Sequence, residues 1–233
     1  FEIMNLTANT LFHYTNSLDN ILNILKEGFY PRYCLEFWDD ILGEKYNYTF
    51  PMVCFCDIPL TKTKEHVKKY GRYAIGLKKS WGTRKGITPV IYSHNKSITM
   101  KSLQIIINNL RKRNFELNTC DKKDDDEIFF EIMTLAKFAK PYKGKLWQNG
   151  KTKKNYIFYN EHEWRFIPKI VCGENRPCQG MTESVFRDSV FRADQNKKLE
   201  KYKLNFGPKD IKYIIISSDK EYDSMFSFMT HYL

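Results

Sequence analysis

The most constraining feature of the sequence is an amphipathic segment, residues 16–28, that directly follows the β-prone run 10–15. Apolar residues recur in it at the i, i+3, i+4, i+7 spacing of one helical face: Leu18, Ile21, Leu22 and Leu25. Asn16 or Ser17 can cap the start of this helix, and Gly28 can end it. A helix with one apolar face has to bury that face against a second layer.

The remaining segments predict a mixture of strands and helices. We expect further strands at 51–56, 73–77, 89–92, 156–159, 164–167 and 212–217, the last of them buried. We expect further helices at 61–70, 97–113, 127–138 and 219–229. Irregular structure is expected at 29–50, around Trp81, and at 172–210. Strands dominate both ends and helices fill the middle, so the predicted class is α+β, in a single domain over 1–233 with a helical insertion at about 97–140.

Composition excludes several classes of protein. Hydrophobic residues make up 42% and charged residues 28%, which is typical of a globular domain and too apolar for disorder. No apolar run approaches the ~20 residues of a membrane helix, so we expect no membrane association. Six cysteines without zinc or redox spacing favour free buried thiols and a cytoplasmic location.

The charge of the chain indicates anionic partners. Lys and Arg total 38 against 27 acidic residues, and aromatic residues reach 15%. A positive field with aromatic side chains suits phosphates and stackable bases, so a nucleic acid or a nucleotide is the expected partner. A bias toward Lys, Asn, Tyr, Ile and Phe codons explains the same composition, so charge alone does not assign a function.

Four residues have settings that suit chemistry. His13 lies in the β-prone run just before the first helix, where it could bind a ligand or only satisfy a backbone carbonyl. Tyr70 ends a predicted helix and could stack on a flat heterocycle or pack in the core. Glu161 and Glu163 would share one face of a strand, as a surface ladder or as carboxylates that stabilise an oxocarbenium ion. The sequence lacks the common nucleotide-binding, zinc-protease and serine-hydrolase motifs, and no metal site is predicted.

The order of motifs resembles the AbiGi family, described as the antitoxin half of a bacterial abortive-infection pair. The resemblance spans about residues 8–220 and is carried by the segments 11–28, 31–36, 51–59, 70–71, 76–82, 86–90, 140–142 and 161–165. It implies a genetic role in phage resistance and a partner toxin, but no chemistry.

A looser resemblance, to the ADP-ribosyltransferases of the His-Tyr-Glu class, implies chemistry. A His-x-Thr run before a helix, a helix ending in Tyr, and a late Glu follow the order of that class. The resemblance implies two packed, mainly antiparallel sheets with flanking helices around a central cleft, and NAD as substrate. Carried over by position, His13 would bond a ribose hydroxyl, Tyr70 would stack on nicotinamide, and Glu163 would be the catalytic acid. The wider set of residues expected to bind NAD is His13, Tyr14, Thr15, Tyr70, Tyr73 and Glu161, in which Tyr73 competes with Tyr70 and Glu161 with Glu163.

Two functions follow from the sequence. The first is an enzyme that transfers ADP-ribose from NAD to a nucleic-acid or protein acceptor. The second is a non-catalytic antitoxin that binds a partner toxin, or nucleic acid, through its basic surface.

Overall fold

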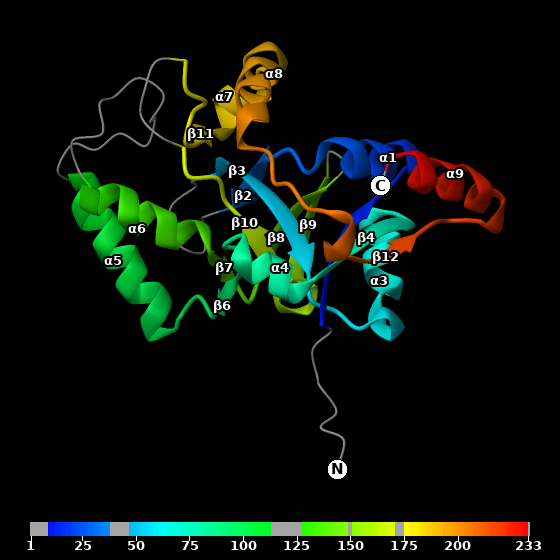
Figure 1. The fold of residues 1–233 in the computed structure, drawn as a ribbon. Coiled ribbons are helices and arrows are strands. Elements are labelled where there is room, and N and C mark those ends of the chain that lie inside the picture. The colour runs from blue at the N-terminus through cyan, green and yellow to red at the C-terminus, as the bar shows by residue number, and fades with distance from the viewer. Residues whose placement is uncertain (1–8, 38–46, 113–126, 149–150, 171–174, 233) are drawn as a thin grey trace.

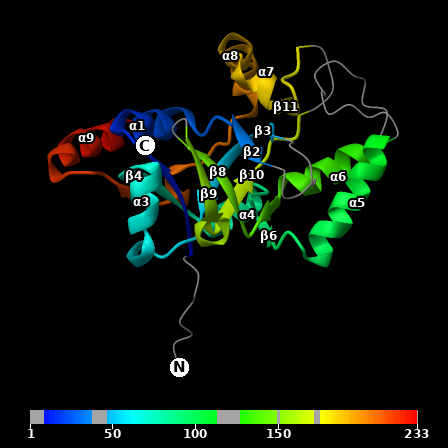
Figure 2. The same ribbon diagram turned by 180° about the vertical axis from the view of Figure 1, so that it is seen from behind.

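The structure is a computed structural model, and it describes residues 9–37, 47–112, 127–148, 151–170 and 175–232. Within them the fold is a mixed α+β arrangement, as predicted, built on an antiparallel sheet with helices on both sides and at both ends (Figure 1). The helices α5 and α6 lie at one end of the molecule, and α1 and α9 lie at the other (Figures 1 and 2).

One large sheet organises the molecule. Its main path has the strand order β12-β4-β1-β3-β10-β5, and β2 and β11 also pair with β3. All of these pairings are antiparallel. In chain order the strands are β1 (Thr10–Thr15), β2 (Arg32–Phe37), β3 (Asn47–Cys56), β4 (Tyr73–Lys78), β5 (Thr88–Pro89), β10 (Glu163–Phe166), β11 (Met181–Thr182) and β12 (Ile211–Ile215).

The long strand β3 joins two sets of partners. Its first half, residues 47–52, pairs with β2 and β11, and its second half, 53–56, pairs with β10 and meets β1 at Cys56. The expected pair of packed sheets is therefore one eight-stranded sheet in which β3 changes partners midway. Two small sheets complete the described strands: the parallel pair β6 (Ile91–Ser93) and β7 (Ala139–Pro141), and the antiparallel hairpin β8 (Lys143–Gln148) and β9 (Lys151–Ile157).

The helices follow the apolar periodicity where the sequence has one. Ser17 caps the first helix by accepting a hydrogen bond from the Asn20 N–H, and Ile21 and Leu25 are buried, as predicted. The α-helices are α1 (Leu18–Glu27), α3 (Lys64–Tyr70), α4 (Lys79–Arg84), α5 (Ile98–Lys112), α6 (Glu127–Lys137), α7 (Glu183–Arg187), α8 (Ser189–Lys198) and α9 (Tyr222–Tyr232).

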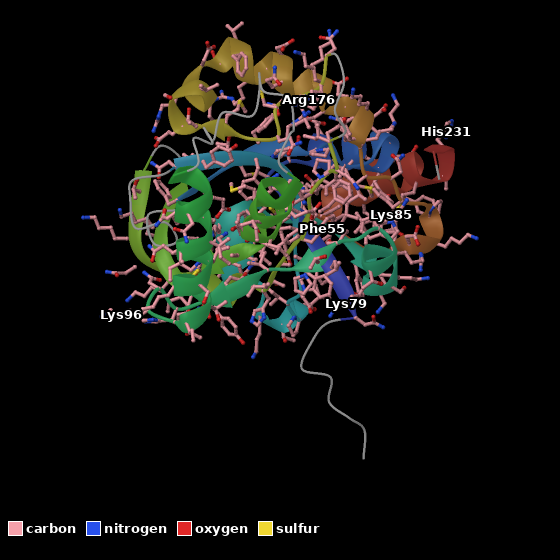
Figure 3. The ribbon with its side chains drawn as sticks, turned by 90° about the vertical axis from the view of Figure 1, so that its left-hand side faces the viewer. Phe55, Lys79, Lys85, Lys96, Arg176 and His231 are labelled. Carbon is pink, nitrogen blue, oxygen red and sulfur yellow. The ribbon has the colours of Figure 1, made fainter. Side chains whose placement is uncertain are left out.

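The sheet has two faces of different character. We call the first the apolar face, because its residues form the main core with α1, α4 and α9: Leu11, Val53, Phe55, Ile75, Leu77, Trp164 and Phe166. Phe55 lies in the interior, whereas Lys96 and His231 lie at the periphery (Figure 3). By strand alternation the opposite face, here called the cavity face, carries Phe12, Tyr14, Cys54, Cys56, Glu163 and Arg165.

Several expectations about local structure were wrong. Residues 32–37 form β2 rather than irregular chain, because they pair with β3 over their whole length. The expected loop around Trp81 is the helix α4, which buries the Trp81 indole to 1% exposure. The polar stretch 172–210 contains α7 and α8, and Asp188 caps α8 by accepting from the Val190 and Phe191 N–H groups.

The last strand was also misjudged. Among the described strands it is an edge strand whose single partner is β4, and Tyr213 on it is 41% exposed, so it is not buried as expected. Cys178 takes part in a disulfide bond, which corrects the expectation of a free thiol at that position. Cys34, Cys54 and Cys56 are free thiols.

Candidate functional site

A cavity of about 380 Å³ opens on the cavity face of the sheet. It collects residues from β1, β2, β3, α3 and β10, and from the 3-10 turn Phe158–Glu161. The sequence-predicted residues that line it are His13, Tyr14, Tyr70, Glu161 and Glu163. Thr15 and Tyr73 are not among its lining residues.

The cavity lies where β1 and β3 separate. The two strands share one partner pair in the ladder, Phe12 with Cys56. Beyond it His13 occupies the gap, and its Nδ1–H donates to the Cys54 carbonyl at 2.8 Å. Its ring is held edge-on between Phe29 and Phe55, with centroids 5.0 and 5.8 Å away. Because Nδ1 donates, Nε2 of the neutral ring is an acceptor.

Burial keeps the His13 ring neutral. Desolvation lowers the pKa of His13 below its ordinary value, and the hydrogen bond to the Cys54 carbonyl opposes this only in part. A neutral imidazole with one fixed donor offers its second nitrogen to a hydroxyl group of a ligand. The backbone-satisfying role of His13 and a ligand-binding role are therefore compatible, since they use different nitrogens.

Glu163 lies on β10 with both of its oxygens held. The Arg165 Nε donates to its Oε1 at 2.7 Å, and the Lys140 Nζ donates to its Oε2 at 2.8 Å. The side chain of Arg165 is completely buried and also donates to the Lys137 carbonyl and to Glu36. Glu163 and Arg165 share a strand face because they are two residues apart.

Glu161 reaches the same place by a different route. The expected strand at 156–159 ends as β9 at Ile157, and Glu161 closes the following 3-10 turn. His162 then adopts the left-handed conformation, at φ 44° and ψ 48°, and reverses the chain into β10. Glu161 and Glu163 therefore do not share a strand face, which corrects the prediction, yet the Lys140 ammonium contacts both carboxylates.

Six charged side chains form what we call the charge cluster: Glu36, Glu161, Glu163, Lys69, Lys140 and Arg165. Three carboxylates balance three cations. Burial by itself would raise the pKa of Glu163, but Arg165 and Lys140 hold it well below its usual range. The pKa of Glu161 is likewise raised by burial and lowered overall by Lys140 and Lys69. Both carboxylates are therefore ionised at neutral pH.

Tyr70 is placed by the end of α3 and by the glycine that follows. Its hydroxyl donates to Glu161 Oε1 at 2.7 Å, while the residue is 39% exposed. Gly71 has φ +114°, and a Cβ there would lie 2.1 Å from the Thr15 carbonyl oxygen. This close approach to β1 requires glycine, and it sets the position of Tyr70 against the cavity.

Tyr70 and Tyr73, the two candidates for the tyrosine that stacks on nicotinamide, lie in different places. Tyr73 is on β4, and its hydroxyl donates to Glu221 at 2.6 Å, away from the cavity. Thr15 accepts a hydrogen bond from Asn20 at the start of α1. Tyr14 lines the cavity, and burial raises the pKa of its hydroxyl to about 12.

Sequence reasoning missed four members of the charge cluster: Glu36, Lys69, Lys140 and Arg165. The segment Lys140–Tyr142 and the residue Arg165 stood within recognised motifs, but nothing in their spacing indicated buried cations. Among the described residues, no group of three or more His, Cys, Asp or Glu side chains is placed to hold a metal ion. The helices of the described part of the chain include none with the length and apolar content needed to cross a membrane.

Comparison with known proteins identifies the family. A family model described as "Putative abortive phage resistance protein AbiGi, antitoxin" matches residues 27–217. The chain belongs to the AbiGi family. It is 29% identical to the abortive phage resistance protein AbiGi of Lactococcus lactis subsp. cremoris, over an alignment that covers 87% of each chain. The AbiGi resemblance seen in the sequence is confirmed, and it supports a role in phage defence. No solved structure matches the chain significantly.

Proposed function

We propose that this AbiGi protein binds NAD in the cavity and transfers ADP-ribose from it as part of phage defence. The observation that carries the proposal is the convergence of His13, Tyr70 and Glu163 on one cavity from three distant segments. A volume of about 380 Å³ lies within the range of small-molecule sites, at roughly 300–1,000 Å³. It suits the nicotinamide–ribose half of NAD, with the adenylate half extending toward the mouth.

Each residue has a distinct role in this proposal. His13 Nε2 accepts a hydrogen bond from a ribose hydroxyl, and the partly exposed ring of Tyr70 lies against nicotinamide. Glu163 stays ionised and is held by two cations, so it is preorganised to stabilise positive charge on the ribose. Lys140 and Arg165 act as positioning residues, because they act through Glu163.

The reaction breaks one bond and forms one bond. The bond between the ribose C1′ and the nicotinamide nitrogen breaks, and its electron pair leaves with nicotinamide, which becomes neutral. The cation-like C1′ then bonds to a nucleophilic atom of the acceptor or to the oxygen of a water molecule, and the proton that this atom loses passes to solvent. Ionised Glu163 stabilises the charge that develops on the ribose, and this charge exists fully only in the transition state.

The test is nicotinamide release by wild type and by Glu163→Gln. The substitution keeps the size of the side chain and removes its charge, so turnover should fall by about 10²–10³-fold while NAD binding is largely kept. Glu161→Gln, which also removes a carboxylate of the charge cluster, should cost less. Full turnover by Glu163→Gln, measured on folded protein, would refute the role of Glu163.

The family's description as an antitoxin favours a second candidate function, in which the chain binds a partner toxin without catalysis. Co-purification of the partner toxin with wild type and, in parallel, with Glu163→Gln distinguishes the two functions. A complex that forms equally well with wild type and with this variant, in a system where wild type releases no nicotinamide, would favour the binding function.

A further inference from the structure

A basic groove adjoins the cavity on the side of α3. We call it the α3–β9 groove; it has a volume of about 770 Å³ and runs between α3, β9 and the 3-10 turn. Its charged lining residues are Lys62, Glu65, Lys68, Lys69 and Lys153. His66 and Leu146 line both this groove and the cavity, so the two spaces share a wall.

Two of the groove's lysines have no acidic partner among the residues that the structure describes. Lys68 pairs with Glu65 at 3.1 Å, and Lys69 belongs to the charge cluster. Within the described part of the chain, Lys62 and Lys153 form no ion pair, and both are exposed. Free ammonium groups along a groove are the sites at which a phosphodiester backbone releases counterions.

The positive charge continues past Asn155. This residue lines both the α3–β9 groove and a neighbouring hollow of about 360 Å³. The hollow is lined by Lys143, Lys145 and Lys154, and no acidic residue is among its described lining. The hairpin segment 143–157 holds five lysines and no Asp or Glu. A run of cations this long suits an extended polyanion rather than a single phosphate.

A cluster of exposed aromatic rings adjoins the groove through His162. His162 lines the groove, and its ring is 5.3 Å from that of Tyr159, which is 47% exposed. The ring of Tyr142, which is 41% exposed, also lies 5.5 Å from that of Tyr159. Cations beside exposed rings are the combination that binds single-stranded nucleic acid, because unpaired bases can stack on the rings.

We propose that the α3–β9 groove binds single-stranded nucleic acid and presents a nucleotide to the cavity as the acceptor of ADP-ribose. The binding half stands by itself, and the acceptor half rests on the proposed function. An acidic protein would use the lysines but would have no use for the ring cluster Tyr142, Tyr159 and His162. RNA and DNA share the chemistry that the groove recognises, since both offer a phosphodiester chain and exposed bases.

The experiment measures binding of labelled mixed-sequence oligonucleotides, of RNA and of DNA, by fluorescence anisotropy without NAD. The double variant Lys62→Glu/Lys153→Glu should weaken binding at least about tenfold and flatten the salt dependence by about 0.7 in log–log slope for each phosphate that the protein no longer neutralises. The control Lys197→Glu/Lys209→Glu has the same charge change on α8 and at Lys209, outside the groove, and should bind like wild type. Tyr159→Ala should weaken binding about tenfold because a base can no longer stack there, with little change in salt slope.

Three results would contradict the binding of single-stranded nucleic acid in the α3–β9 groove. They are equal weakening in both double variants, tighter binding of a duplex than of either single strand, and equal competition by an acidic peptide of matched charge. The proposed function is tested apart from this by NAD binding without oligonucleotide. The acceptor role predicts that wild type transfers label from NAD to the bound strand. Lys62→Glu/Lys153→Glu should lose this transfer while it still hydrolyses NAD and releases nicotinamide. Transfer to the strand that is unaffected by the groove variant would refute the acceptor role.

Discussion

The same strands of the central sheet bury apolar side chains on one face and charged side chains on the other. On β10, Trp164 and Phe166 point to the apolar face, while Glu163 and Arg165 point to the cavity face. The apolar face packs against α1, α4 and α9 and includes Ile75 and Leu77 at 0% exposure. The cavity face instead buries the charge cluster.

The difference between the two faces indicates which face stabilises the fold and which face carries the function. Burying apolar surface stabilises the fold by about 25 cal/mol per Å². Burying ions costs several kcal/mol for each charge, and a good network about offsets that cost, so apolar side chains of similar volume could often replace it without loss. The charge cluster is therefore weak evidence for stability, and its presence beside a cavity favours a role in chemistry.

The largest effect is expected for Arg165→Met. This substitution leaves Glu163 and Glu36 buried with fewer cations, so the free energy of unfolding should fall by about 3–5 kcal/mol in a denaturant titration. Adding Glu163→Gln should recover part of the loss, because it removes the carboxylate left without its partner. A loss under ~1 kcal/mol for the single variant would mean that the cavity face is not a buried ionic network.

A second effect is the acid sensitivity of the neutral histidines. The folded-state pKa values of His13 and His66 are lowered, mainly by burial, so the unfolded chain takes up protons first as pH falls. Well above pH ~6.5 these histidines do not change the free energy of unfolding. As pH falls below this value, the free energy of unfolding decreases by up to about 1.4 kcal/mol per pH unit for each histidine.

The measurement is the free energy of unfolding between about pH 7.5 and 5, on either side of the ordinary histidine pKa, with His13→Gln as the variant. His13→Gln should reduce the slope of the free energy of unfolding against pH by the contribution of one histidine. A slope that His13→Gln does not alter would contradict a neutral, buried His13.

A third variant tests the apolar face. Ile21→Val removes one buried methylene at 0% exposure and should cost about 0.5–1.5 kcal/mol. Because Ile21 lies on α1 in the core of the apolar face and does not line the cavity, NAD binding should be unchanged once the protein is folded. Loss of binding in stably folded Ile21→Val would show that the two faces are not independent.

The smallest effect is expected at an exposed ion pair. Lys68 and Glu65 are 3.1 Å apart, with side chains 63% and 80% exposed. Lys68→Ala should change the free energy of unfolding by less than about 0.5 kcal/mol, because solvent screens the pair. A cost comparable to that of Arg165→Met would remove the contrast between buried and exposed charge.

Local signals predicted much of the fold. The periodicity of residues 18–25 and the cap at Ser17 predicted α1, and short β-prone or apolar runs predicted β1, residues 51–56 of β3, β4 and β10. The elements that were missed depend on tertiary contacts. Strand β2 exists because it pairs with β3, and α4 exists because Trp81 is buried, neither of which is visible in a short window of sequence.

The site was predictable in part for the same reason. His13, Tyr70 and Glu163 were named from their order along the chain, and all three line the cavity. The cations that hold Glu163 were not predicted, because Lys140 and Arg165 look like ordinary surface charges until β10 and β7 bring them together. The left-handed His162 was likewise unpredictable, and it is what brings Glu161 to Lys140 without a shared strand face.

The most direct test of the cavity is a denaturant titration with and without NAD. If NAD binds the folded chain, a concentration of ~100 times its dissociation constant should raise the free energy of unfolding by about 2.7 kcal/mol. We expect that Tyr70→Ala and His13→Ala lose this gain, that Glu163→Gln keeps most of it, and that Tyr73→Phe keeps all of it. No gain for folded wild type at millimolar NAD, or a gain that Tyr70→Ala and His13→Ala leave intact, would contradict a nucleotide site in this cavity.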